Sequence, residues 1–407
     1  MRGDGVSSVF HRTAQPVEAV AAQGCWVVDA GGNRYLDAAG GAIVCGVGHG
    51  RPEIAAALAD QAIALDYVHA ATFTTPALET YADRLSAHLP MEEPRVFPVS
   101  GGSEATETAI KLALAYHAAR GEPHRTRLVG RRASYHGNTL AALDLSGRAS
   151  LRSPYEALLG RFSHLPASTE SDDPSWHART LEEALVEFGD VAAFVGEPIG
   201  GAASAGAVPP DGYWEAITDV CRRHGVLVVA DEVMTGFGRT GRWFAADHFG
   251  LRPDILTAGK GAASGYWPLG LCVASDEVAA TVGEGRFVHG FTYSHHPIGA
   301  AVAGAVLTII EEEHLVERSA EAGDRLRRRL VGAGFEGLVG AGFEGLSGRG
   351  LLIGLEVGDS AEVTAACRRN GLLVYPATRS AILLGPPLTI GDDEIVELVS
   401  RLSLAAG

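Results

Sequence analysis

The feature that most constrains the fold is a series of short apolar segments without polar alternation, separated by stretches of helical character. Strands are expected at 96–99, 127–129, 191–197, 226–231, 254–257 and 269–273. Helices are expected between them, near 103–119, 178–188 and 211–224. Strands that are apolar on both faces need cover on both faces, which helices between parallel strands provide. The sequence therefore predicts an α/β fold with a mostly parallel sheet flanked by helices.

The two ends of the chain follow a different pattern. Residues 24–37 predict a β-hairpin, because two short apolar strands flank a Gly-Gly-Asn turn. Helices are expected at 52–66, 76–89, 297–313, 314–333, 360–370 and 391–404, and strands at 351–357, 372–375 and 381–384. We expect a large α/β domain over 51–300 and a small α+β domain over 301–407. The N-terminal segment, 1–50, is expected to join the small domain through its hairpin.

One internal repeat is present, since Val331–Leu338 recurs as Val339–Leu346. It is too short for a solenoid, which stacks several supersecondary units. We interpret it as a local duplication in a surface connection.

Composition excludes several function classes. A net charge of -16 argues against a nucleic-acid partner, which needs a clustered basic surface, and the arginine-rich stretch at 325–329 is expected to be a solvated helix face. The five cysteines are widely spaced without a C-x-x-C pair, so neither a disulfide framework nor a metal site is predicted. No apolar run predicts a signal peptide or a membrane span. We expect a cytoplasmic protein.

Lysine usage points to one residue. The chain has 33 cationic side chains, and only Lys111 and Lys260 are lysines. Arginine stays protonated, whereas a desolvated lysine can lose its proton and form an imine with a carbonyl. Lys260 follows an apolar strand and stands between two glycines. It is therefore the candidate nucleophile, and Lys111, within a predicted helix, is expected to be structural.

Two further features suit an anionic, aromatic ligand. Gly102 and Ser103 follow a strand and open a helix, where glycine permits close approach and the helix N-terminus attracts anions. Asp231 ends a very apolar strand and shares a face with Val233. The carboxyl end of a parallel strand faces the usual ligand crevice. Each feature alone is also compatible with a cap or a structural ion pair.

Three other segments carry candidate side chains. Tyr135 and His136 precede a glycine in a turn suited to stacking on a flat ring, Glu197 follows a strand, and Thr292 precedes a helix. An anion cup, an aromatic stacker, a strand-end aspartate and a strand-end lysine are together the parts that hold pyridoxal phosphate. The carboxylate would keep the pyridine nitrogen protonated, so that the ring accepts electrons.

The same segments match a known family in order along the chain. Ser100–Lys111, Tyr135–Asn138, Ala230–Gly241, Thr257–Gly261 and Gly385–Leu388 resemble the motifs of class III (ω-type, fold type I) pyridoxal-phosphate aminotransferases. The similarity runs from about residue 20 to 400. It implies a large domain with a seven-stranded, mostly parallel sheet, a smaller α+β domain, and a homodimer with sites shared between subunits.

The resemblance also implies roles for the candidate residues. Lys260 would form the internal aldimine and then move the α-proton, while Asp231 would pair with the pyridine nitrogen. The other implied cofactor contacts are Gly102 and Ser103 to the phosphate, Tyr135 and Val233 to the two ring faces, His136 beside the stacking residue, Glu197 on the substrate side, and Thr292 to the phosphate of the neighbouring subunit.

Departures from the family pattern concern the substrate. Leu383 stands where many members carry an arginine that clamps a substrate carboxylate. Arg379, in a nearby loop, could replace that arginine or be an exposed loop residue. Thr106 replaces the family's usual asparagine. An amino acid, an ω-amine and an amino sugar or other secondary-metabolite ketone all remain open as substrates.

The resemblance implies amino transfer from a donor amine to a carbonyl acceptor in two ping-pong half-reactions. Decarboxylases, racemases and aminomutases share the fold and the motifs and remain alternatives. A non-catalytic pyridoxal-phosphate-binding protein is a more remote one, because such proteins usually carry a DNA-binding region or have lost the lysine.

Overall fold

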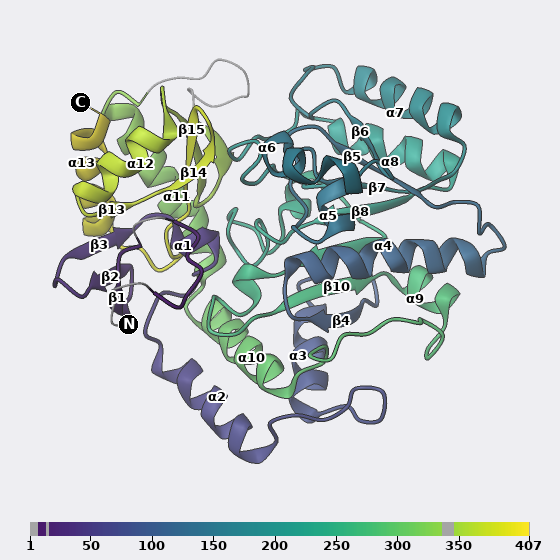
Figure 1. The fold of residues 1–407 in the computed structure, drawn as a ribbon, viewed down its shortest axis with the longest axis horizontal. Helices are drawn as coiled ribbons and strands as arrows, with labels where there is room; N and C mark the ends of the chain where they lie inside the picture. Colours follow the sequence, from purple (N-terminus) through teal and green to yellow (C-terminus); the bar gives the residue numbers. More distant parts are fainter. Residues whose placement is uncertain (1–6, 14–15, 336–345, 407) are drawn as a thin grey trace.

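A seven-stranded sheet forms the centre of the computed structural model, which describes residues 7–13, 16–335 and 346–406 (Figure 1). Its strands, in spatial order, are β4 (Arg95–Val99), β10 (Gly270–Ala274), β9 (Ile255–Ala258), β8 (Leu227–Asp231), β7 (Val191–Gly196), β5 (Arg127–Arg131) and β6 (Ser163–Leu165). Strand β10 pairs antiparallel with both β4 and β9, and the remaining pairings are parallel. The predicted mostly parallel sheet is confirmed.

Helices cover both faces of this sheet, as its apolar strands require. Ala193 and Val195 of β7 pack on one face with α4 (Gly102–Ala119) and α9 (Asp276–Val282). Phe194, between them, packs on the other face with α7 (Pro174–Phe188) and α8 (Tyr213–His224). Every residue of β7 and β8 is buried. This explains why neither strand shows polar alternation.

Two four-stranded sheets lie beside the central sheet. One is antiparallel, in the order β11 (Ser347–Arg349), β12 (Leu352–Glu356), β15 (Ala381–Leu384) and β14 (Tyr375–Thr378). The other has the order β1 (Ala19–Gln23), β2 (Trp26–Asp29), β3 (Arg34–Asp37) and β13 (Leu372–Leu373). The parallel pairing of β3 with β13 therefore joins the N-terminal hairpin to a strand from the last part of the chain.

The remaining helices link and cover these sheets. They are α2 (Pro52–Ala64), α3 (Pro76–Ser86), α10 (Pro297–Glu312), α11 (Leu315–Gly332), α12 (Ser360–Arg369) and α13 (Asp392–Ala406). Helix α10 packs against α2 and α3, which lie below the central sheet in Figure 1. Short turns complete the path: α1 (Gly40–Ile43), α5 (Leu140–Leu145), α6 (Ala149–Arg152), η1 (Ser153–Leu158), η2 (Ala245–Phe249) and η3 (Lys260–Ala262).

The structure corrects a few details of the sequence-based expectations. The single strand expected at 372–375 is two strands in different sheets, which separate at Val374. The helix expected at 178–188 begins at Pro174, where Asp173 caps it. Most of the duplicated segment, residues 336–345, lies outside the described residues. Across the described ranges, no helix combines the length and the apolar character needed to cross a bilayer.

Candidate active site

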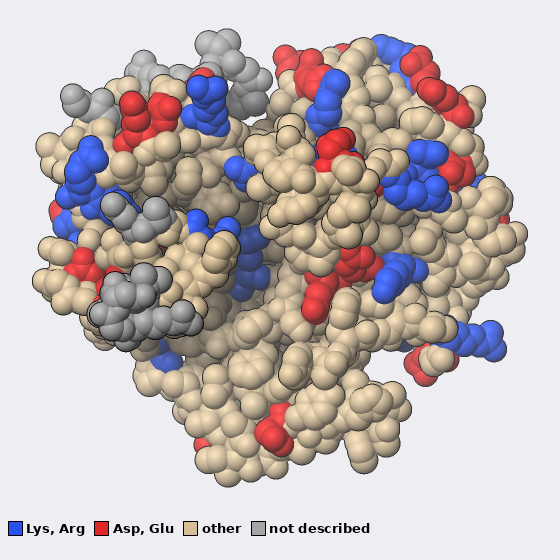
Figure 2. All heavy atoms as spheres, in the orientation of Figure 1, with Lys and Arg blue, Asp and Glu red and all other residues tan. Residues whose placement is uncertain are grey.

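The candidate site is a cavity of about 410 Å³ at the carboxyl ends of the parallel strands. Figure 2 shows a hollow between the part of the molecule that contains the seven-stranded sheet and the part that contains the two four-stranded sheets, with atoms of lysine or arginine, in blue, on its walls. Strands β4, β5, β7, β8 and β9 all end at one edge of the sheet, so the residues that follow them converge there. The wall includes Gly102, Ser103, Tyr135, His136, Glu197, Asp231, Val233 and Lys260. All candidate residues except Thr292 and Arg379 therefore share one cavity.

The glycine-rich turn that opens α4 is shaped by close contacts. A Cβ on Gly102 would lie 2.7 Å from Cγ1 of Val233, so only glycine fits without displacing that side chain. The hydroxyl of Ser103 accepts a hydrogen bond from the amide of Asn138 at 3.0 Å. The first N–H groups of a helix have no acceptor within the helix. Gly102 and Ser103, the first two residues of α4, line the cavity. This turn can bind a phosphate.

The Asp231 carboxylate is held from two sides. His136 Nδ1 lies 2.7 Å from Asp231 Oδ2, and the amide of Val233 donates to Asp231 Oδ1 at 3.0 Å. Both the aspartate and the histidine are buried. Asp231 can therefore present a fixed negative charge to a ligand in the cavity.

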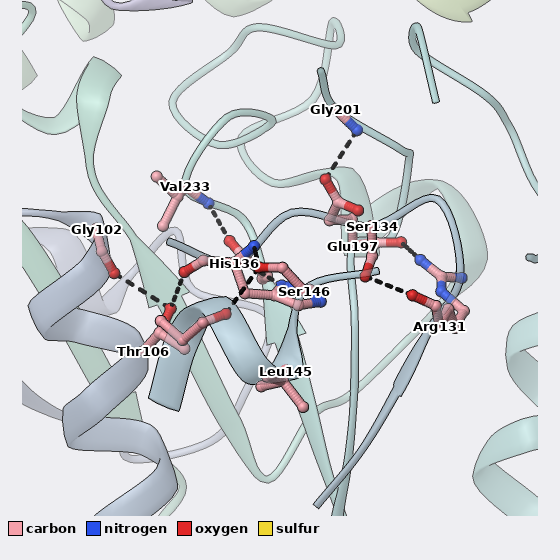
Figure 3. A network of polar contacts seen from close by, with 12 residues as sticks. Gly102, Thr106, Arg131, Ser134, His136, Leu145, Ser146, Glu197, Gly201 and Val233 are labelled. Atoms are coloured by element: carbon pink, nitrogen blue, oxygen red, sulfur yellow. Dashed lines mark hydrogen bonds and ion pairs between the residues drawn. The ribbon is translucent and has the colours of Figure 1, made fainter. Parts of the chain in front are cut away.

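His136 is itself fixed by its neighbours (Figure 3). Its amide donates to the hydroxyl of Ser146 at 2.8 Å, and the hydroxyl of Thr106 donates to its carbonyl at 2.7 Å. Thr106, the departure from the family's asparagine, thus ties helix α4 to the turn that carries His136. Ser146 could not be predicted from the sequence, because its contact with His136 depends on how the chain folds back after α5.

Lys260 is the first residue of η3 and has a left-handed backbone, with φ of +40°. Such a conformation costs a non-glycine residue roughly 1–3 kcal/mol and is often found at functional sites. Burial lowers the pKa of the Lys260 amine, while the charges of Asp231 and Glu197 act in the opposite direction. The amine thus needs less free energy to become a neutral nucleophile. Lys111, by contrast, is exposed on α4.

Glu197 follows β7 and lines the same cavity, and Figure 3 shows it between Gly201 and Arg131. Its Oε1 accepts the amide of Gly201 at 2.9 Å, and burial raises the pKa of its carboxyl group. Arg131, at the end of β5, donates to the Glu197 carbonyl at 2.7 Å. Sequence reasoning missed Arg131, although a charged residue at the end of an apolar strand was a usable signal.

Two candidate residues lie away from this cavity. Thr292 is exposed, and its carbonyl accepts the hydroxyl of Tyr67 at 3.0 Å. Arg379 is exposed in the turn between β14 and β15. Leu383 is fully buried in β15. The roles suggested for Thr292 and Arg379 stay predictions.

The chain belongs to the class III aminotransferases, because the model of that family, Aminotransferase class-III, matches residues 9–406. It is 36% identical to an uncharacterized aminotransferase of Bacillus subtilis, over 96% of this chain and 95% of the relative. It is 34% identical to the putrescine–pyruvate aminotransferase of Pseudomonas aeruginosa, over 93% of this chain and 88% of that protein.

Solved structures give the same result. An (S)-enantioselective omega-transaminase from Thermomicrobium roseum aligns with a TM-score of 0.89 and 36% identity, over 96% of this chain and 92% of that one. An omega transaminase from Pseudomonas jessenii, solved in complex with PMP, aligns with a TM-score of 0.90 and 31% identity, over 96% and 92% of the two chains. The chain is thus an aminotransferase of fold type I that depends on pyridoxal phosphate.

The cavity residues fit this cofactor. Among the described residues, His136 Nε2 and Glu197 Oε2 are buried polar atoms without a hydrogen-bond partner. A buried polar atom normally has a partner, and the Glu197 carboxyl belongs to the cavity wall, where a polar ligand can supply one. The helix start at Gly102 suits the phosphate, and Asp231 suits a protonated ring nitrogen.

Proposed function

We propose that this aminotransferase uses Lys260 as its catalytic lysine and Asp231 as the residue that keeps the cofactor ring charged. The observation that carries the proposal is that one cavity wall contains both side chains together with the Gly102 turn. When bound, pyridoxal phosphate supplies an aldehyde that takes up the amino group and a ring that accepts electron density.

The proposed work of the protein is binding, orientation and proton transfer. In the first half-reaction the amine of Lys260, with its pKa lowered by burial, can take a proton from the donor carbon, and in the second half-reaction it can give a proton to the acceptor carbon. Asp231 stabilises a positive charge on the ring nitrogen, and His136 fixes the orientation of Asp231 at 2.7 Å. Gly102, Ser103, Tyr135 and Val233 would hold the phosphate and the two ring faces.

The proposal extends to assembly and location. We place the protein in the cytoplasm as a homodimer in which Thr292 of each subunit reaches the phosphate bound by the other. The exposure of Thr292 is compatible with such a contact. We also propose that residues 1–50 and 301–407 form one domain and residues 51–300 the other, which the pairing of β3 with β13 supports.

The two lysines of the chain provide the test and its control. Lys260→Ala should lower amino transfer from an amine donor to a 2-oxo acid by more than about a thousandfold, because both attachment and proton transfer are lost. Lys111→Ala removes an exposed lysine and should leave the rate within about twofold. A Lys260→Ala enzyme with appreciable turnover would refute the proposed role.

A further inference from the structure

The turn that carries Lys260 has an unfavourable backbone conformation at both of its ends. Lys260 has φ of +40°, and Ser264, four residues later, has φ of +50°. The amide of Ser264 donates to the carbonyl of Lys260 at 2.9 Å and closes the turn. Residues other than glycine rarely adopt a left-handed backbone, and it persists only where neighbouring groups hold it. Contacts from outside the turn must therefore keep it in place.

These contacts come from a glycine-rich segment near the N-terminus, residues 44–51. The hydroxyl of Ser264 accepts the amide of Gly46 at 2.8 Å and the amide of Val47 at 3.0 Å. Ser264 is 2% exposed and both bonds are buried, so removal of the hydroxyl would leave two buried donors without this acceptor. One oxygen atom thus joins two segments that lie 218 residues apart in the sequence.

A second contact between the same two segments involves Tyr266. Its hydroxyl accepts the amide of Arg51 at 2.8 Å and donates to the carbonyl of Gly48 at 3.0 Å. Arg51 is itself fixed, because its guanidinium donates to both carboxylate oxygens of Glu313, at 2.7 and 2.8 Å. Residues 44–51 therefore form a fixed support for the chain that follows Lys260.

The two joined segments also meet at the wall of the cavity. Val44 and Gly265 both line the cavity, and a Cβ on Gly265 would lie 3.3 Å from Cγ1 of Val44. Lys260 lines the same cavity. Ser264 is not among the described residues that line it, so its hydroxyl can affect a bound cofactor only through its neighbours. Lys260 is the neighbour that can react.

We propose that Ser264 is a positioning residue for Lys260. By anchoring the turn to residues 44–51, its hydroxyl fixes the direction in which the Lys260 amine enters the cavity. A reacting group displaced by about 1 Å can lose about a hundredfold in reactivity, so the anchor affects the bond that the amine forms. This inference rests on the proposed function, in which the amine condenses with the cofactor aldehyde. A C=N bond forms, and the carbonyl oxygen leaves as water with the two protons of the amine.

The test compares two forms of the cofactor that share the ring and the phosphate. Pyridoxal phosphate carries the aldehyde with which Lys260 can bond, whereas pyridoxamine phosphate carries an amine and binds without that bond. Titration of the full-length apoprotein gives a dissociation constant for each form, and the ratio of the two constants reports the bond to Lys260. Ser264→Ala should lower the preference for pyridoxal phosphate by about tenfold to a hundredfold, while the dissociation constant of pyridoxamine phosphate changes by less than about threefold.

Ser264→Gly separates the role of the hydroxyl from that of the backbone. Glycine adopts a left-handed backbone at no steric cost, so this variant loses the two hydrogen bonds but is not strained, and it carries the test if Ser264→Ala does not fold. It should show the same loss of preference. Ser319→Ala is the matched control, because the buried Ser319 hydroxyl also bonds two backbone groups, the Arg239 carbonyl at 3.2 Å and the Leu351 amide at 3.4 Å. This control should leave the ratio within about twofold of the wild-type value.

The effect of Ser264 must pass through Lys260. In a Lys260→Ala background, Ser264→Ala should therefore leave the ratio of the two dissociation constants within about twofold. Equal losses for both cofactor forms, an unchanged ratio in the Ser264 variants, or a ratio that still changes without Lys260 would each overturn the inference. These results would leave the proposed function intact. The proposed function itself fails if the wild-type protein shows no preference for pyridoxal phosphate and borohydride fixes no cofactor on Lys260.

Discussion

Substituting Gly102 by alanine tests the packing that shapes the floor of the cavity. The added Cβ would lie 2.7 Å from Cγ1 and 3.3 Å from Cγ2 of Val233, whereas carbon atoms pack at about 3.5–4.0 Å. Val233 is β-branched and stiff at χ1, so it cannot move aside at low cost. Overpacking of this kind costs about 1–3 kcal/mol. We expect Gly102→Ala to lower the free energy of unfolding of the apoprotein by that amount.

Whether Gly102→Ala lowers or raises the free energy of unfolding decides whether the contact with Val233 matters. The backbone of Gly102 is not left-handed, so alanine without the steric clash would raise the free energy of unfolding by about 0.4–1 kcal/mol. Gly304 in α10 is the matched control, because a Cβ there meets nothing within 4 Å. Gly304→Ala should raise the unfolding free energy by up to about 1 kcal/mol.

A double-mutant cycle completes the measurement. Val233→Ala removes both methyl groups that the new Cβ would meet, so Gly102→Ala should cost at least about 1 kcal/mol less in that background. The assay is urea unfolding of the apoprotein, with titration of pyridoxal phosphate as a second readout. Gly102→Ala should also weaken cofactor binding about tenfold or more, because the displaced turn carries the phosphate-binding N–H groups. Additive effects in the cycle, or a stabilised Gly102→Ala protein, would refute the reasoning.

Two further predictions concern buried polar groups. Thr106→Val keeps the shape of the side chain but removes the hydroxyl that donates to the buried His136 carbonyl at 2.7 Å. This substitution should lower the free energy of unfolding by about 1–3 kcal/mol. A change below about 0.3 kcal/mol in urea unfolding would contradict the expectation. Burial raises the pKa of Glu232 from 4.5 to about 7. Between these two pH values the folded state binds more protons than the unfolded state, so the free energy of unfolding of the wild-type protein falls as the pH rises. Glu232→Gln should flatten this fall in urea unfolding measured across the window, and an unchanged pH slope would disprove the assignment.

The sequence predicted the central sheet well because its signals are local. The apolar runs that became β7 and β8 are buried over their full length, and such runs have few alternatives in a globular chain. The edge strand β6, Ser163–Leu165, escaped prediction because only one of its three residues is apolar. Strand β1, Ala19–Gln23, was missed for a different reason, since three of its five residues are alanine, which favours strands only weakly.

The site divides in the same way between local and tertiary information. Gly102, Asp231 and Lys260 could be found in the sequence, because each lies within about three residues of the end of a strand and parallel strands bring such positions together. The bond from Ser146 to His136 and that from Gly46 to Ser264 join residues whose proximity no local pattern encodes. The left-handed backbone of Lys260 was likewise invisible, since flanking glycines do not determine the conformation of the residue between them.

The most direct test of the central claim is where the cofactor becomes attached. Holoenzyme loaded with pyridoxal phosphate would be treated with borohydride and digested, and the peptides would be mapped by mass. We predict that the cofactor mass is fixed on Lys260 and that the label disappears in Lys260→Ala but persists in Lys111→Ala. Label on Lys111, or none on a protein that binds the cofactor, would contradict the account.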